Sequence, residues 1–155
     1  MNNQTKHQTL RLLKDISENA RMGKNACEQL LAKTENRQIV QELRREQQQY
    51  ISLSRRADQL LQAMDERPKP EGVLQRMGQW MGMQMDTLTD RSPAHLADML
   101  IQGATMGVVE MTKARSANPD ADEEAQAIAA EFIASQQAAI DRLKIILTQA
   151  VPAGK

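Results

Sequence analysis

Aromatic residues are almost missing from this chain, whose 155 residues include one tryptophan, one tyrosine and one phenylalanine, at Trp80, Tyr50 and Phe132. Single-stranded nucleic acid is commonly held by stacking bases on aromatic side chains, so this shortage argues against that function. Charge of one sign is also missing, because 20 basic residues balance 20 acidic residues. No net field attracts nucleic acid or an anionic membrane, and we expect neither as a partner.

Cysteine is equally scarce. The single cysteine, Cys27, excludes a disulfide within the chain and a zinc site made of cysteines. The N-terminal run MNNQTKHQTLRLLKD lacks the apolar stretch that a secretory signal needs. These features are typical of a cytoplasmic protein. The position of Cys27 between Gly23 and Leu30 indicates a buried thiol rather than a nucleophile.

Helix-forming residues dominate what is present, and the apolar ones recur at spacings of three and four. This pattern predicts an all-α single domain over residues 1–155. A short insert helix is expected at about 72–88. The long helices are expected at about 5–32, 35–64, 93–115 and 119–149. Together they describe an antiparallel four-helix bundle with the extra helix in the crossover between helices 2 and 3.

The predicted helices begin and end at identifiable residues. Thr34 is the expected N-cap of the second long helix. Ser92-Pro93 starts the third with a capping hydroxyl and a proline in the first turn, and Asn118-Pro119 repeats this signal before the fourth. Between the second and third long helices, the run DERPKPEG contains two prolines that cannot continue a helix.

Four amphipathic helices with a long connection between the second and the third resemble the ferritin-like superfamily. The run LTDRSPAHLADMLIQGATMGVVEMTK is similar to uncharacterised bacterial members of that group. The resemblance implies a ferritin-like fold. Di-iron members carry Glu-x-x-His on two helices. Here the only histidines are His7 and His95, Ser92 stands three residues before His95, and no Glu-x-x-His occurs. We therefore expect no metal and no cofactor.

Three glutamates keep a carboxylate metal site open as an alternative. Glu46, Glu110 and Glu131 fall near inner faces in the middle of their helices, where the ligands of a ferritin-like centre would lie. Their other interpretation is structural, because buried polar groups need partners and a layer of them can set helix register. The residues considered for such a layer are Gln47, Tyr50, Ser54, Glu110 and Gln136.

The segment MGQWMGMQMDTLTD, residues 77–90, holds four methionines and the only tryptophan. Its apolar residues recur at helical spacing and predict a short amphipathic helix whose stripe we interpret as an interaction surface. The residues of that surface are Met77, Trp80, Met81 and Met85. Thioether ligation of copper(I) is the other interpretation. At helical spacing, however, Met83 points away from Met81 and Met85.

Glycines stand four residues apart in the insert, at Gly78 and Gly82, and again in the third long helix, at Gly103 and Gly107. Each glycine inside a helix costs about 1 kcal/mol relative to alanine, so tertiary packing must hold the insert in place. We expect these four positions to be sites of close helix packing that let the insert lie against the bundle.

No catalytic constellation is evident, and the expected function is non-catalytic. The sequence favours a cytoplasmic helical-bundle protein that acts through self-association, as a homo-oligomer, or through a protein partner. The alternative is a metal-binding ferritin-like protein that uses either Glu46, Glu110 and Glu131 or the Met77–Met85 cluster.

Overall fold

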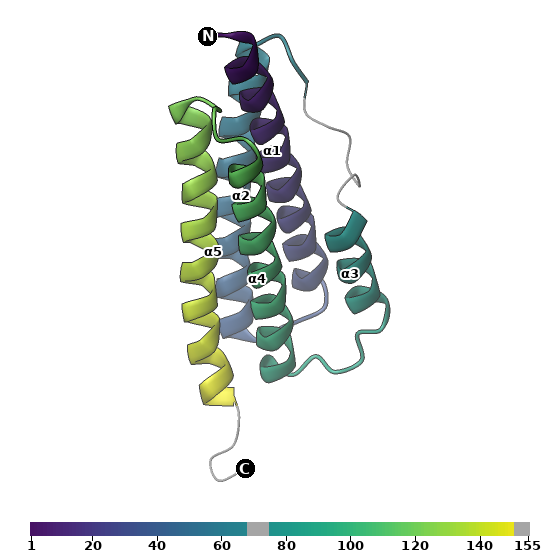
Figure 1. The fold of residues 1–155 in the computed structure, drawn as a ribbon. Helices are drawn as coiled ribbons and strands as arrows, with labels where there is room; N and C mark the ends of the chain where they lie inside the picture. The colour runs from purple at the N-terminus through teal and green to yellow at the C-terminus, as the bar shows by residue number, and fades with distance from the viewer. Residues whose placement is uncertain (68–74, 151–155) are drawn as a thin grey trace.

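The computed structural model describes residues 1–67 and 75–150, and in these ranges it contains five helices and no strand. The four long helices are α1 (Asn3–Leu31), α2 (Arg37–Ala63), α4 (Pro93–Ala117) and α5 (Glu123–Ala150). The short helix α3 (Gln75–Asp86) lies beside them (Figure 1). The expected all-α fold is therefore confirmed for this part of the chain. None of the helices found there combines the length and the hydropathy needed to cross a membrane.

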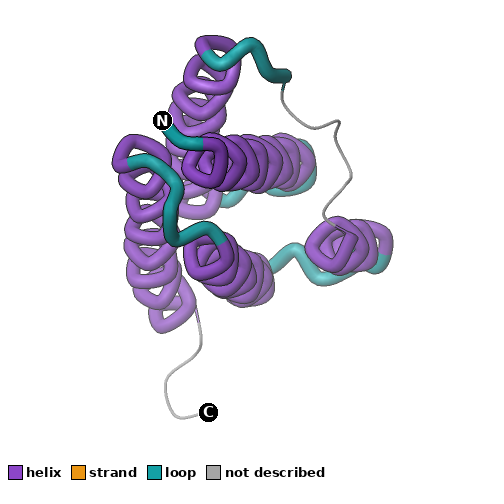
Figure 2. Tube along the Cα trace, turned by 45° about the horizontal axis from the view of Figure 1, so that its top comes forward, coloured by secondary structure: helices purple, strands orange, loops and turns teal. Residues whose placement is uncertain are grey.

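The four long helices are grouped side by side (Figure 2), and hydrogen bonds near their ends define their directions. Near the start of α1, the Thr9 hydroxyl accepts from the backbone N–H of Asp122, directly before α5 (2.9 Å). In the first turn of α2, Gln38 donates to Gln149 in the last turn of α5 (3.0 Å). Hence α1 and α5 run in one direction and α2 in the other. Because α4 enters α5 through a short turn, α4 runs parallel to α2, and the connection containing α3 travels the length of the bundle.

Side-chain oxygens that accept backbone hydrogen bonds begin the helices. The side chain of Asn2 accepts from the N–H of Thr5 (2.7 Å) and begins α1. The Ser92 hydroxyl accepts from the N–H of His95 (3.3 Å), with Pro93 in the first turn of α4. The start predicted from Ser92 and Pro93 is confirmed.

The cap predicted for α2 is wrong. The residue that begins this helix is Asn36, whose side-chain oxygen accepts from the N–H of Ile39 (3.0 Å). The Thr34 hydroxyl instead accepts from the N–H of Asn36 (3.2 Å) and supports the turn before the helix. Two neighbouring residues can both cap, and the geometry of this turn selects the second.

The start signal predicted before the last helix is also displaced. Asn118 ends α4, where its side-chain amide donates to the carbonyl of Ala114 (2.8 Å). The capping oxygen of α5 belongs to Asp122, which accepts from the N–H of Ala125 (2.9 Å). Consequently α5 begins at Glu123, four residues after the expected start.

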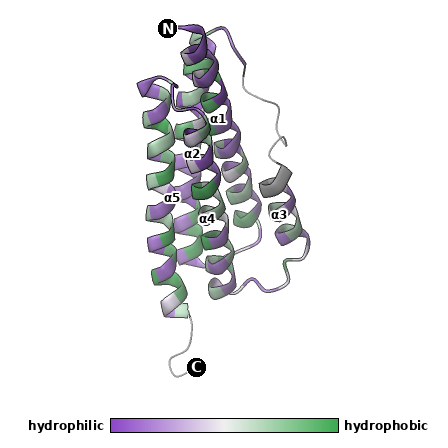
Figure 3. Ribbon diagram, viewed as in Figure 1, coloured by the Kyte–Doolittle hydropathy of each residue, from purple (hydrophilic) through white to green (hydrophobic). Residues whose placement is uncertain are grey.

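Hydrophobic residues recur along each long helix between hydrophilic ones (Figure 3), and the buried ones form one aliphatic core. Each large side chain that is removed from water contributes about 1.5–3 kcal/mol. The most deeply buried large side chains are Leu12, Leu13, Ile16, Leu30, Ile39, Leu43, Leu53, Leu61, Leu96, Met111, Phe132 and Leu143.

Helix α3 packs against α1 and α4 through one face. Met85 is 8% exposed and belongs to the core, and Met81 packs against the core from outside. On the other side of the helix, Met83 is 63% exposed. The amphipathic pattern of the insert therefore places one face on the bundle of the same chain.

The glycines of α3 do not make the predicted close contact. A Cβ built at Gly78 or Gly82 meets no heavy atom of the described chain within 4 Å beyond its own helix. The prediction of close helix packing is wrong for these two positions. The reason is that α3 turns Trp80 and Met81, rather than its glycines, toward α4.

The tight approach occurs at a glycine of α1 instead. A Cβ at Gly23 would lie 2.5 Å from the ring of Tyr50, which real side chains do not tolerate. By comparison, a Cβ at Gly103 would lie 3.5 Å from the Trp80 ring, and one at Gly107 would lie 3.5 Å from the nearest side-chain atom of α5. Those two distances are ordinary van der Waals contacts.

Replacing Gly23 by alanine should destabilise the protein by about 1–3 kcal/mol, because the new methyl must displace the buried Tyr50 ring. The matched change Gly107→Ala should be neutral or stabilise by up to about 1 kcal/mol, through better helix propensity without a clash. Chemical denaturation followed by circular dichroism measures both. A Gly23→Ala variant that is at least as stable as the parent would contradict the tight contact.

Candidate functional site

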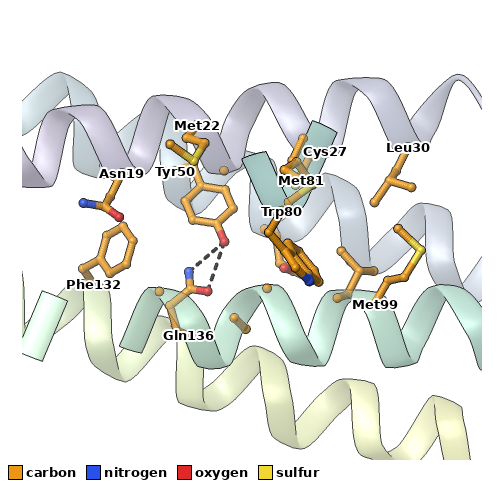
Figure 4. A pocket seen from close by; sticks show the side chains of 17 residues that line it. Asn19, Met22, Cys27, Leu30, Tyr50, Trp80, Met81, Met99, Phe132 and Gln136 are labelled. Carbon is orange, nitrogen blue, oxygen red and sulfur yellow. Dashed lines mark hydrogen bonds between the residues drawn. The ribbon is translucent and has the colours of Figure 1, made fainter. Parts of the chain in front are cut away.

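A cavity of about 40 Å³ lies between α3 and the bundle, and residues of all five helices line it (Figure 4). Trp80 and Met81 form its α3 side, and Glu46 and Tyr50 come from α2. We call it the α3 cavity. A buried water needs about 10–15 Å³ of such space, so the α3 cavity has room for a molecule the size of about three waters.

All the Phe, Tyr and Trp residues of the protein line the α3 cavity: Tyr50, Trp80 and Phe132. The rings of Tyr50 and Phe132 are tilted by 49° with their centres 6.1 Å apart. The Trp80 ring approaches α4 at Gly103. Three helices thus bring the only three aromatic rings to one site. Most known small-molecule sites are lined in this way, by apolar and aromatic side chains with a few polar groups.

One polar pair crosses the α3 cavity. The hydroxyl of Tyr50 lies 3.0 Å from Oε1 of Gln136 and accepts from Nε2 at 2.9 Å, as the dashed lines in Figure 4 show. Both residues are buried, and burial, more than any nearby charge, raises the pKa of Tyr50 well above its usual range. The phenol therefore stays protonated and holds α2 to α5.

The other residues predicted for a polar layer have partners elsewhere. Gln47 donates to Glu28 on the outer side of α1 (3.4 Å), and the Ser54 hydroxyl donates to the carbonyl of Ile51 in its own helix (3.1 Å). Glu110 is half-buried on α4. In the part of the chain that the structure describes, the predicted layer reduces to one pair of side chains.

Two neighbouring glutamates of α2 are buried and differ in their partners. Glu42, 5% exposed, accepts two hydrogen bonds from Arg142, at 2.8 and 3.0 Å. Such a bidentate pair is among the stronger charge-assisted interactions. Glu46, one turn further along α2, is 4% exposed and lines the α3 cavity. Its Oε2 has no hydrogen-bond partner within the described ranges.

Burial raises the pKa of Glu46 well above its usual range, and a hydrogen bond with Glu42 and the charge of Glu42 raise it further. The charge of Arg142 acts in the opposite direction and does not outweigh these effects. The surroundings therefore favour the neutral carboxylic acid at Glu46, and Arg142 forms its ion pair with Glu42.

A second oxygen in the α3 cavity also lacks a partner. Asn19 of α1 is 3% exposed, and its Nδ2 donates to the carbonyl of Asp15 (2.8 Å). Its Oδ1 meets no donor among the residues that the structure describes. A buried oxygen that accepts no hydrogen bond lowers stability by about 1–3 kcal/mol. Such oxygens are therefore expected where a bound ligand or water donates the missing hydrogen bond.

The thiol of Cys27 lies in the same wall and does not resemble a catalytic nucleophile. The residue is 2% exposed, and burial raises the pKa of the thiol well above its usual range. A thiol in such surroundings stays protonated and behaves as a small apolar group.

The three glutamates considered for a metal site lie in different surroundings. Glu46 faces the α3 cavity, whereas Glu131 is about half exposed and pairs with Arg56 at 2.6 Å. Glu110 is half-buried on α4. Within residues 1–67 and 78–150, no three side chains of His, Cys, Asp or Glu come close enough to share a metal ion.

The residues predicted as an interaction surface are turned toward their own bundle. Trp80 and Met81 line the α3 cavity and Met85 is buried in the core. The side chain of Met77 lies outside the described residues. Met83 is exposed on the far side of α3, so the thioethers of this segment do not point to one place.

Sequence reasoning missed this cavity, although two signals were present. Tyr50 and Phe132 fall at inner positions of predicted helices, and Glu46 stands one turn before Tyr50 on the inner face of α2. Asn19 and Met22 of α1 were not singled out, because nothing in their spacing separates them from an ordinary polar or core position.

Glu46→Gln should stabilise the protein at neutral pH. At pH values above 4.5, the ordinary pKa of a glutamate, Glu46 is ionised in the unfolded chain. In the folded protein its raised pKa keeps it protonated. Stability therefore falls as pH rises through the interval between the two pKa values, by up to about 1.4 kcal/mol per pH unit. Glutamine does not titrate, so the gain should disappear below about pH 4. Urea denaturation across pH measures this, and a constant difference between parent and variant would contradict a protonated Glu46.

Comparison of the chain with protein-family models, with curated proteins and with solved structures finds no match. The resemblance to the ferritin-like superfamily accordingly stays an expectation from the sequence.

Proposed function

We propose that the protein is a non-catalytic binding protein that holds a small, mostly apolar molecule in the α3 cavity. The observation that carries this proposal is the lining of the cavity. It contains the three aromatic rings of the chain and two residues, Glu46 and Asn19, that each have a buried oxygen without a hydrogen-bond partner in the described chain. Apolar walls with a few polar groups are the usual lining of a small-molecule site. The protonated thiol of Cys27 and the protonated carboxyl group of Glu46 offer no nucleophile with an adjacent base.

Helix α3 is the element that admits the ligand in this proposal. Its interior glycines, Gly78 and Gly82, each cost about 1 kcal/mol relative to alanine and make no compensating contact. It is held on the bundle mainly by Trp80, Met81 and Met85. Elements with few buried contacts open at lower free energy than the core, so α3 can separate while the four long helices stay folded.

We also propose that the four long helices form a ferritin-like bundle. The support is the order of directions, in which α2 and α4 are parallel and the connection between them runs the length of the bundle. One long crossover is the feature that distinguishes ferritin-like bundles from bundles with short loops only.

Self-association is a second candidate function. It is favoured by a groove of about 340 Å³ between α1 and α3, along which Gly78 and Gly82 leave the backbone of α3 uncovered. Because glycine has no side chain, another backbone can approach α3 closely at these two positions. A helix of a second copy of the chain can therefore fit into the groove between α1 and α3.

Small-molecule binding is tested with propan-1-ol, followed by Trp80 fluorescence and by NMR. The parent should show saturable binding, and Gly103→Leu should abolish it, because the new side chain occupies the space beside Trp80. The matched variant Gln102→Leu adds the same side chain at an exposed position of α4 and should bind like the parent. Unsaturable behaviour of the parent, or equal binding by Gly103→Leu, would contradict the proposal.

Self-association is tested by sedimentation equilibrium of the parent and of Gly82→Gln. A dimer through the α1–α3 groove should weaken in the variant, because the glutamine side chain fills the groove, while circular dichroism stays unchanged. Gln79→Ala, at another exposed position of α3, serves as the control. A parent that sediments as a monomer would remove this candidate.

A further inference from the structure

Glu46 is the feature of the α3 cavity that an apolar ligand leaves unexplained. The residue is 4% exposed, and its Oε2 has no hydrogen-bond partner within the described chain. Most of the remaining lining is carbon and sulfur. A buried carboxyl oxygen without a hydrogen-bond partner, on a residue that lines a cavity, marks a place where a ligand can supply that partner.

Two carboxyl groups, those of Glu42 and Glu46, lie near a single basic side chain, Arg142. From α2 the neighbouring charge is Glu42, and from α5 it is Arg142, whose guanidinium already binds both oxygens of Glu42. From α1 the thiol of Cys27 interacts with Glu46. The residues that α3 and α4 bring to the described wall carry no charge. The one guanidinium near these two carboxyl groups is therefore bound to Glu42, and Glu46 has no basic partner of its own in the described wall.

Helix geometry places an aromatic ring at the level of Glu46. Trp80 contacts α4 at Gly103. One turn further along α4, Gly107 contacts Gln136 of α5. Glu46 stands one turn before Tyr50, which is hydrogen-bonded to Gln136. Gly107 of α4 and Tyr50 of α2 both contact Gln136 and so lie at one level. Because α2 and α4 run in the same direction, Gly103 and Glu46, each one turn earlier, also lie at one level of the bundle.

An indole ring beside a carboxyl group attracts organic cations. The faces of Trp and Tyr attract an ammonium group, and the attraction grows when water is excluded. The remaining wall suits an alkyl group, since it is formed by flexible apolar side chains, among them Met22, Leu30 and Met99. In the view of Figure 4, Trp80 lies between Tyr50 on one side and Leu30 and Met99 on the other.

We propose that the α3 cavity binds a small alkylammonium ion, whose N–H donates to Oε2 of Glu46 and whose alkyl group lies among the methionine and aromatic side chains. This inference rests on the proposed function and names the ligand class for the same site. The size of the cavity limits the ligand to a few heavy atoms while α3 is in place.

Binding of the ammonium ion changes the ionisation of Glu46. In the free protein the carboxyl group keeps its proton, because burial excludes water and because Glu42 is adjacent. The bound cation favours the carboxylate, so the proton leaves to solvent and the ammonium group takes its place as the positive partner. The ion pair of Glu42 with Arg142 is kept throughout.

The test compares propylammonium with propan-1-ol, its neutral counterpart of nearly equal size, by NMR titration in phosphate buffer. The parent should bind propylammonium more tightly by about tenfold or more, through the added charge and N–H contacts. Glu46→Gln keeps the shape of the side chain but cannot ionise, so the preference for propylammonium over propan-1-ol should disappear. Glu131→Gln, an exposed glutamate of α5, is the matched control and should keep the preference.

The outcomes separate the ligand class from the site. Equal binding of the two compounds by the parent, or an unchanged preference in Glu46→Gln, overturns the ammonium inference and leaves binding in the α3 cavity standing. Absence of binding by both compounds overturns the inference and the proposed function together. Tetramethylammonium, which is charged but has no N–H, should bind more weakly than propylammonium, and equal binding overturns the hydrogen bond to Glu46.

Discussion

Tyr50 joins three of the long helices at one level of the bundle. Its ring lies against Gly23 of α1, and its hydroxyl is hydrogen-bonded to Gln136 of α5. The centre of its ring is 6.1 Å from that of Phe132. Any side chain at Gly23 would occupy the space of the ring, so the separation of α1 and α2 depends on this glycine. The α3 cavity is built around the same contact, which gives it a rigid inner wall.

The carboxyl groups of α2 impose the second constraint. Arg142 satisfies Glu42 through two hydrogen bonds, which leaves Glu46 without a basic partner of its own. A buried carboxyl group of this kind lowers stability at neutral pH relative to an uncharged residue of the same shape. Proteins commonly retain such destabilising groups at functional positions, where activity needs them. The ligand proposed here supplies the charge that the bundle omits.

The behaviour of α3 follows from its composition. Gly78 and Gly82 weaken the helix, and methionine side chains attach it to the bundle through adaptable contacts. The contacts that attach α3 reach the core of the bundle at Met85, which is buried there. The orientation of Trp80 and Met81 toward the cavity also limits the apolar surface that α3 presents to solvent.

The sequence by itself determined the all-α architecture and the start of α4, because helical periodicity and capping by Ser92 are local properties. It did not determine which of two nearby residues caps α2, since Thr34 and Asn36 are both suitable and only the turn geometry selects between them. The direction in which α3 faces was likewise undetermined. A helical stripe that contains Met81 has the same spacing whether a partner or its own bundle covers it.

Tertiary structure alone decided the cavity and its chemistry. Tyr50, Trp80 and Phe132 are far apart in the sequence, and they meet because α2, α3 and α5 are brought together by packing. The same applies to Arg142, which pairs with Glu42 across 100 positions of the chain and so leaves Glu46 as the acid without a cation. Spacing reports which residues share a face of one helix. It carries no information on which faces of different helices meet, because that depends on the summed packing of side chains over the whole bundle.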